Sequence, residues 1–197
     1  MHRPQTVAVP FVALGLQQRA VKAQLLAAVD RVLEHGQYVL GPEVEEFERR
    51  FAALCGTPFA VGMSDGTHAL LLALRALGIG PGDEVITAPN SFLASAASIA
   101  LAGARPVFAD VRDDLNIDPA RVAAAVTPRT RAIMPVHLTG RPADMERIGA
   151  IAQRHGLHIV EDAAQAIGAT LHGRAVGGFG AAGCFSLHPL KNLAARG

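Results

Sequence analysis

Short apolar segments alternate with helical segments from residue 59 onward, and this alternation restricts the fold more than any other feature of the sequence. The expected strands are 59–62, 84–88, 105–109, 131–136 and 158–161, followed by further short strands and turns in 169–186. The expected helices are 67–77, 91–102, 119–126 and 142–155. Strands joined through helices lie parallel and are covered on both faces. We therefore expect an α/β fold with three layers, α/β/α, around a mostly parallel sheet.

The segment before this alternation has a different pattern, an irregular lead followed by helices. Apolar residues at helical spacing predict a helix over 17–35. Pro42 suits the first turn of a second helix, 43–54, whose first turn is acidic, as the helix dipole favours. We therefore divide the chain into an N-terminal lead with helices, 1–58, and a large domain, 59–197.

Composition excludes several classes of protein. Half of the residues are hydrophobic and 18% are charged, so extended disorder is not expected. The 18 basic and 17 acidic residues nearly balance, which gives no reason to expect a nucleic-acid partner. Cys55 and Cys184 are too few for a disulfide framework and form no CxxC metal pair. The sequence shows neither a membrane-spanning apolar run nor a cleavable leader, so we expect a cytoplasmic protein without a membrane partner.

Parallel sheets bind ligands at the carboxyl ends of their strands, so the residues that follow each strand are the first candidates for a site. Gly66 and Thr67 begin a helix after the first expected strand, where backbone N–H groups and the helix dipole favour an anion. The segment has neither the GxGxxG nor the GxxxxGK[ST] pattern, which disfavours dinucleotides and nucleoside triphosphates. An ordinary helix cap by Ser64, Asp65 or Thr67 would explain the same residues without a ligand.

Two further strand ends carry residues suited to a flat, cationic ligand. Phe92 follows the second strand and could stack on a ring, although a core phenylalanine is the more ordinary interpretation. Glu161 and Asp162 end an apolar strand, where a carboxylate is costly to bury unless it is paired or faces a cation. Asp162 could hold a protonated ring nitrogen, with Gln165 nearby, or it could cap the next segment.

The last signal is the apolar segment 184–193, CFSLHPLKNL, which contains Lys191. Lys22 and Lys191 are the only lysines in the chain. Apolar surroundings favour the uncharged amine of a lysine, which can then form a Schiff base. A surface lysine with a buried stem is the ordinary alternative. His188 by itself is more often a structural histidine than a catalytic one.

The order and spacing of these segments resemble one family. The segments GMSDGTHALLLALRALGIGPGDEVITAPNSF, MPVHLTGRPADM, IVEDAAQAIGA and CFSLHPLKNL closely resemble the DegT/StrS family, and the resemblance extends over about 36–193. Members of this family are fold type I aminotransferases that use pyridoxal 5′-phosphate and act mostly on nucleotide-linked keto sugars. The resemblance implies that 59–197 is the cofactor-binding large domain. It also implies a nucleotide-sugar substrate and an amino-acid donor, glutamate by default.

The resemblance implies a role for each candidate residue. Lys191 matches the catalytic lysine that carries the cofactor and moves a proton once it is released. Asp162 matches the carboxylate that keeps the ring nitrogen protonated. The other implied cofactor contacts are Gln165 at the phenolic oxygen, Phe92 on the ring face, Gly66, Thr67 and Ser186 at the phosphate, and His188 nearby without an assigned step.

His68 and the segment Thr139-Gly140-Arg141 differ from the family pattern, and Lys191 distinguishes between two activities within the family. His68 stands where the family often has Asp, and a backbone N–H at this position would serve the phosphate either way. Thr139-Gly140-Arg141 replaces a more usual Tyr-Gly-Gln, which alters either the substrate pocket or only local packing. Some relatives are sugar dehydratases with His in place of the lysine, so Lys191 favours transamination.

Members of the family are about twice as long as this chain. The resemblance therefore implies the N-terminal portion of a longer enzyme, without its C-terminal domain, and a homodimer when the protein is full length. The alternatives are a truncated non-catalytic remnant or interaction module, and a pyridoxal-phosphate-dependent sugar dehydratase. We expect the isolated 197-residue chain to be inactive, because its sheet edge is open and its site is not closed.

Overall fold

The computed structural model describes residues 9–195 of the chain. Residues 1–8 of the expected irregular lead and residues 196–197 of the expected large domain lie outside this range. No helix in the described range is long and apolar enough to cross a membrane. The same range contains no group of three or more His, Cys, Asp or Glu side chains placed to hold a metal ion.

The chain divides into two compact units, Met1–Glu45 and Glu46–Gly197, and each is described by itself. The division expected after residue 58 concerns domains and stays a prediction. The described part of the first unit is helical. It contains α1 (Leu14–Gln18), α2 (Lys22–His35) and the start of α3 (Pro42–Cys55).

The helices of the first unit agree with the sequence only in part. The expected helix 43–54 is confirmed as α3, with Pro42 as its first residue. The expected helix 17–35 is instead the two helices α1 and α2, because hydrogen bonds of the tighter i to i+3 type turn the chain at 19–21. α2 ends at Gly36, whose φ of +69° is the left-handed conformation of a helix C-cap.

The second unit is an α/β structure with a five-stranded sheet in the order β2-β1-β3-β4-β7, in which all neighbours are parallel. The strands of this sheet are β1 (Glu84–Thr87), β2 (Arg105–Phe108), β3 (Thr130–Met134), β4 (His158–Asp162) and β7 (Ala182–Cys184). The helices that follow α3 are α4 (Gly66–Ala76), α5 (Ala94–Leu101), α6 (Pro119–Ala125), the 3-10 turn η1 (Leu138–Gly140) and α7 (Met145–His155). β5 (Thr170–Leu171) and β6 (Arg174–Ala175) form a small antiparallel ribbon. The expected fold class is therefore confirmed.

The expected strand 59–62 is wrong. These residues pair with none of the strands in the described part of the chain, and Phe59 and Val61 are exposed. Instead of a strand, a side chain of the preceding helix α3 contacts this backbone: the Glu48 carboxylate accepts the Gly62 N–H at 2.6 Å. A short apolar run becomes a strand only where a neighbouring strand satisfies its backbone groups, and the run itself does not reveal that neighbour.

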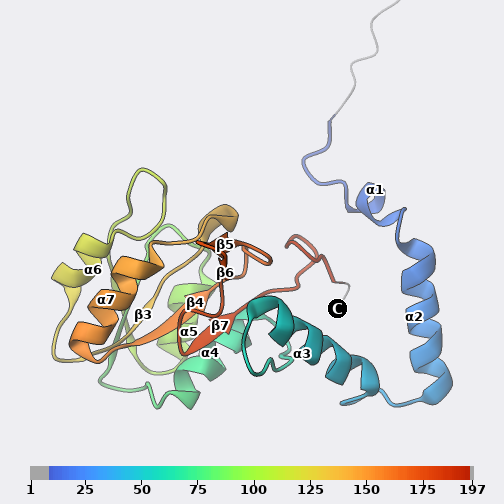
Figure 1. Cartoon of the computed structure of the whole chain (residues 1–197), viewed down its shortest axis with the longest axis horizontal. Helices are drawn as coiled ribbons and strands as arrows, with labels where there is room; N and C mark the ends of the chain where they lie inside the picture. The colour runs from blue at the N-terminus through green and yellow to red at the C-terminus, as the bar shows by residue number, and fades with distance from the viewer. Residues whose placement is uncertain (1–8, 196–197) are drawn as a thin grey trace, which may run out of the picture. The chain divides into compact units, whose positions relative to one another are not determined.

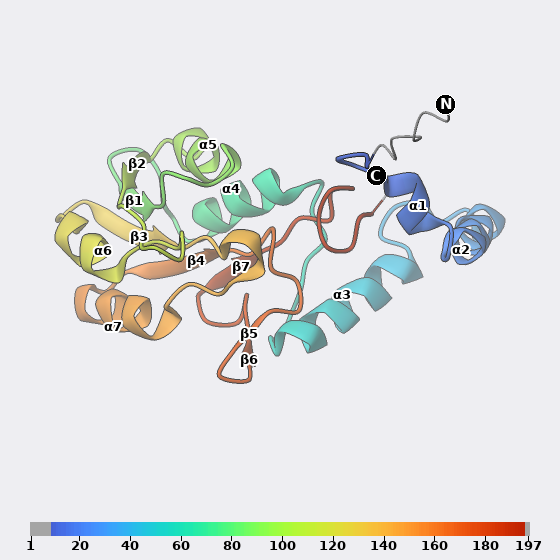
Figure 2. The same ribbon diagram turned by 90° about the horizontal axis from the view of Figure 1, so that it is seen from above.

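The sheet lies between two helical layers, with α4 and α5 on one face and α6 and α7 on the other (Figures 1 and 2). On the first face Leu74 and Ile99 pack with Val85 of β1. On the second face Ile148 packs with Ile86 of the same strand. All four residues of β1 are buried because both faces are covered, which explains why the strands read as continuous apolar runs.

Glu84 joins the amino ends of three strands. Its side chain is only 1% exposed, yet it accepts hydrogen bonds from Arg105 (2.6 Å), Arg129 (2.7 Å) and the Thr127 hydroxyl (2.7 Å). The Arg105 and Thr127 hydrogen bonds are the main reasons that the pKa of Glu84 falls from 4.5 to about 2. The buried carboxylate is therefore fully partnered at this end of the sheet.

We predict that Glu84→Gln lowers the free energy of unfolding at neutral pH and weakens its dependence on acid. A depressed folded pKa stabilises the protein above the unfolded value of 4.5, and this contribution disappears as the pH falls toward about 2. Chemical denaturation at several pH values measures the effect. Glu34→Gln, at an exposed helix position, is the control, and a Glu84→Gln curve as steep as the wild-type curve between these pH values would contradict the prediction.

Candidate active site

Asp162 is a buried carboxylate at the carboxyl end of β4. Its side chain is 5% exposed, and its Oδ2 accepts a hydrogen bond of 2.7 Å from the Ser95 hydroxyl. Its Oδ1 accepts the Ala164 N–H at 3.2 Å, so Asp162 also shapes the turn that follows the strand. The two interpretations of Asp162, a site carboxylate and a local cap, are therefore compatible in this geometry.

Ser95 connects Asp162 to Phe92. Ser95 is 1% exposed in the first turn of α5, and its N–H donates to the Phe92 carbonyl at 3.3 Å, while its hydroxyl oxygen lies 3.4 Å from the same carbonyl. The Phe92 side chain is 71% exposed, so the interpretation as a core phenylalanine is wrong. Its backbone is held to the helix that contacts Asp162, while its ring is free to cover a ligand.

Gln165 has one end of its amide fixed. Its Oε1 accepts the Thr139 backbone N–H at 2.8 Å. A backbone N–H can only donate, so the facing atom is the oxygen, and the Nε2 amino group is left to donate elsewhere. Thr139 lies in η1 with φ of +55°, a conformation that turns its N–H toward Gln165. The segment that differs from the family pattern therefore orients a candidate site residue.

Gly66 and Ser186 are brought together although they are far apart in the sequence. A Cβ added at Gly66 would lie 3.0 Å from the Ser186 Cβ and 3.3 Å from the Phe185 carbonyl oxygen. Glycine thus lets the loop after β7 approach the first residue of α4. Thr67, the next residue of α4, is half-buried at the same helix end.

Asp65 is the cap of α4, as one of the ordinary interpretations predicted. It accepts the His68 N–H at 2.9 Å and contacts the His68 ring at 2.7 Å. The His68 N–H, and then the His68 ring, lower the pKa of Asp65 to about 2. This N–H is already bonded to Asp65, so its expected contact with a phosphate stays a prediction. An anion at this helix end would meet Gly66 and Thr67.

The loop after β7 holds His188 and Lys191. The Ser186 hydroxyl accepts the His188 N–H (3.3 Å), the His188 carbonyl accepts the Lys191 N–H (2.7 Å), and the His188 ring accepts the Leu190 N–H (3.2 Å). His188 therefore shapes the turn that presents Lys191. Within residues 9–195 the half-buried Lys191 side chain forms no hydrogen bond or ion pair.

The ends of β4 and β7 are tied to one another. Asp162 is in register with Cys184, and the Ala163 N–H donates to the Cys184 carbonyl at 2.8 Å. This contact places Asp162 and Ser186 at the same edge of the sheet. Burial, followed by the nearby Asp162 and Glu161, raises the pKa of Cys184 to about 12, and burial also raises the pKa of Cys55. Neither thiol is suited to act as a nucleophile.

The sequence alone did not single out Ser95, and it marked Thr139 only as part of a segment that differs from the family pattern. A serine that recurs in the apolar segment 94–101 was the available signal for Ser95, because a buried hydroxyl needs a partner. Thr139 acts through its backbone, and no side-chain pattern reveals such a contact.

Residues 19–197 match the DegT/DnrJ/EryC1/StrS aminotransferase family. The chain belongs to this family. It is 50% identical over 192 residues to the dTDP-3-amino-3,4,6-trideoxy-alpha-D-glucose transaminase of Streptomyces venezuelae, covering 97% of this chain and 51% of that protein. It is 47% identical over 194 residues to the UDP-N-acetyl-3-dehydro-alpha-D-glucosamine 3-aminotransferase of Acidithiobacillus ferrooxidans, covering 98% of this chain and 53% of that protein.

Solved structures of the family agree with the fold. The crystal structure of DesV from S. venezuelae superimposes with a TM-score of 0.92 at 50% identity, over 96% of this chain and 51% of that one. The pyridoxal-phosphate form of Spr1654 from Streptococcus pneumoniae superimposes with a TM-score of 0.82 at 33% identity, over 86% of this chain and 47% of that one. The chain thus spans about half the length of the curated relatives that it matches.

We predict that Ser95→Ala lowers the free energy of unfolding by about 1–3 kcal/mol, because it leaves a buried oxygen of Asp162 without its donor. Ser98→Ala is the matched control, since Ser98 is equally buried in α5 but donates only to the Ser95 backbone carbonyl. A serine that bonds back to its own helix contributes little, so the control should change stability by less than about 1 kcal/mol. Equal losses in the two variants, measured by chemical denaturation, would contradict the prediction.

Proposed function

We propose that this protein is a pyridoxal-phosphate-dependent aminotransferase that transfers an amino group from an amino acid, glutamate by default, to a nucleotide-linked keto sugar. The observation that carries the proposal is the shared edge of β4 and β7, where the buried Asp162 carboxylate and the Gly66–Ser186 contact lie on adjoining strand ends. The names of relatives support the substrate class, because they include transaminases of dTDP-linked and UDP-linked sugars. By resemblance to the family, we also propose a cytoplasmic homodimer.

The residues at this edge fit pyridoxal phosphate by their donors and acceptors. Asp162 offers a carboxylate oxygen for a ring N–H, and Gln165 offers a free amide N–H for a phenolic oxygen. Gly66, Thr67 and Ser186 gather at a helix start, where backbone N–H groups and the dipole favour a phosphate. These three ligand features, a cationic ring nitrogen, an anionic oxygen and a phosphate, coincide in this cofactor.

The bound cofactor supplies an electron sink for the negative charge that develops on a substrate carbon. Asp162 keeps the ring nitrogen protonated, and the Ser95 hydroxyl holds the Asp162 carboxylate in place for that contact. Gln165 orients the phenolic side of the ring, and Phe92 covers one ring face. Lys191 holds the cofactor through Nζ, and its released amine then moves a proton at the substrate carbon. His188 positions the turn that carries Lys191.

A sugar dehydratase that uses the same cofactor is the second candidate within the family. A lysine is both a covalent carrier and a strong base, whereas a histidine at this position would remove the carrier. Lys191 therefore favours transamination, and no described contact favours dehydration.

We predict that the full-length protein mixed with pyridoxal phosphate develops a visible absorption band that survives gel filtration. Lys191→Ala should abolish this band, because the cofactor loses its covalent carrier. Lys22→Ala is the control, since Lys22 is the other lysine of the chain and lies in the first unit. A wild-type protein that stays colourless at saturating cofactor would refute the proposed function.

We also predict that the 197-residue chain alone binds the cofactor weakly and does not transfer amino groups from glutamate to a nucleotide keto sugar. The reason lies in β7, which leads to Ser186 and Lys191 but is paired only with β4 among the described strands. The loop that carries the lysine is thus supported on one side. Coupled detection of 2-oxoglutarate measures the reaction, and sustained turnover by this chain would contradict the prediction.

A further inference from the structure

Glu161 lies beside Asp162 in β4 but points to the opposite face of the sheet, because side chains alternate along a strand. Its side chain is 0% exposed. The proposed function uses Asp162 and assigns nothing to Glu161. A fully buried carboxylate is costly unless it is well partnered, so its partners indicate what it does in the fold.

Four N–H groups from other segments converge on the Glu161 carboxylate. Oε1 accepts from the backbone of Phe179 (2.7 Å) and Gly180 (2.8 Å), and Oε2 accepts from the backbone of Gly177 (2.7 Å) and from the His137 ring (3.0 Å). Burial tends to raise the pKa of Glu161, but the His137, Gly177 and Gly180 bonds outweigh it, and the pKa lies below its ordinary value. Both oxygens of an ionised carboxylate are thus fully used.

His137 bridges the two acidic residues of β4. Its Nδ1 accepts the Ala143 N–H at 3.0 Å, so the ring proton is on Nε2 and is donated to Glu161. Its backbone N–H donates to the Asp162 carbonyl at 3.0 Å. His137 itself is 0% exposed, immediately before η1. The ring therefore links the end of β3 to β4 and to the segment that leads into α7.

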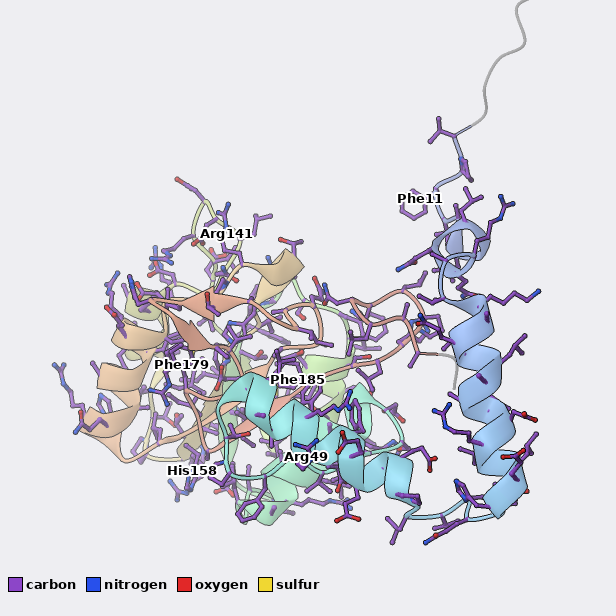
Figure 3. All side chains as sticks on the ribbon, turned by 45° about the vertical axis from the view of Figure 1, so that its right-hand side comes forward. Phe11, Arg49, Arg141, His158, Phe179 and Phe185 are labelled. Carbon is purple, nitrogen blue, oxygen red and sulfur yellow. The ribbon has the colours of Figure 1, made fainter. Side chains whose placement is uncertain are left out.

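The segment 177–180 curls around Glu161 and leads directly into β7. Gly177 has φ of +86°, and a Cβ at Gly180 would overlap the Ile159 carbonyl oxygen, so glycine is required at both positions. Phe179 lies in this segment, and Phe185 follows β7, immediately before Ser186 (Figure 3). Phe185 also packs edge-on against Phe51 of α3, with ring centroids 4.9 Å apart.

We infer that Glu161 and His137 are positioning residues for the active site, which hold the ends of β3, β4 and β7 in one arrangement and so place Gln165 and Ser186 around Asp162. The chain of contacts runs from Glu161 through 177–180 to β7 and Ser186, and from His137 through η1 to the Thr139 N–H that holds Gln165. Among the described residues, neither side chain forms a hydrogen bond or ion pair with a proposed cofactor contact. This inference rests on the proposed function.

The test compares variants that each remove particular hydrogen bonds of Glu161 or His137. Glu161→Gln keeps the shape of the side chain but places an amide NH2 against N–H donors. His137→Gln keeps a donor at the place of Nε2 and loses the Ala143 contact, whereas His137→Asn keeps an acceptor at the place of Nδ1 and loses the bond to Glu161. Glu84→Gln is the matched control, because Glu84 is also a fully partnered buried carboxylate, but at the amino end of the sheet. Pyridoxal phosphate titration of the full-length protein and its variants, followed by the visible band, gives affinity, and thermal unfolding gives stability.

We expect Glu161→Gln and His137→Asn to weaken cofactor affinity about tenfold or more, the size of effect seen when residues behind ligand contacts are changed. His137→Gln should recover most of the affinity, and Glu84→Gln should lose stability with wild-type affinity. Wild-type affinity in both His137→Asn and Glu161→Gln would overturn the inference. Equal loss of affinity in Glu84→Gln, or no recovery in His137→Gln, would overturn it as well, because either result indicates a general loss of stability.

Comparing His137→Asn with His137→Gln tests the positioning role even if Glu161→Gln does not fold. The outcomes also distinguish a failure of this inference from a failure of the proposed function. A wild-type protein that binds no cofactor refutes the proposed function, whereas a wild-type protein and variants that bind equally well refute only the positioning role.

Discussion

The arrangement of the carboxyl edge of the sheet depends on the fully buried carboxylate of Glu161. A charge in such a place persists only if its hydrogen bonds replace the lost water. The fold supplies these bonds from the backbone of 177–180 and from the ring of His137. The same contacts bring the strand ends of β3, β4 and β7 together. Satisfying one buried charge therefore determines where Asp162 and Ser186 lie.

The two ends of the sheet differ in how completely their polar side chains are paired within the protein. At the amino end, the Glu84 carboxylate forms ion pairs with the exposed arginines Arg105 and Arg129. These partners satisfy the carboxylate within the protein itself. At the carboxyl end, two groups have no hydrogen-bond partner among residues 9–195, namely the Lys191 side-chain nitrogen and the Gln165 amide nitrogen. Donors without a partner, on segments that follow β4 and β7, are available to a ligand at the edge that carries Asp162. This contrast agrees with the rule that parallel sheets bind ligands at their carboxyl edge.

Much of the fold follows from local patterns, whereas contacts between distant segments do not. The apolar runs and helical stripes of 84–162 predicted the strands and helices of the sheet because both faces of these strands are covered. The run 59–62 has the same composition and is not a strand, since pairing depends on a neighbour that composition does not reveal. Resemblance to the family supplied the candidate residues. The contacts of Ser95, His137 and Thr139 with Asp162, Glu161 and Gln165 were identified only in the structure.

Locating the attached cofactor tests whether the carboxyl edge of the sheet holds pyridoxal phosphate on Lys191. Borohydride reduction of the protein with bound cofactor makes the link permanent, and peptide mass spectrometry identifies the labelled residue. The sequence provides its own control, because Lys22 is the only other lysine. We expect a pyridoxyl label on Lys191, with Lys22 unmodified, at concentrations that saturate the visible band. Equal labelling of both lysines, or labelling that avoids Lys191, would contradict it.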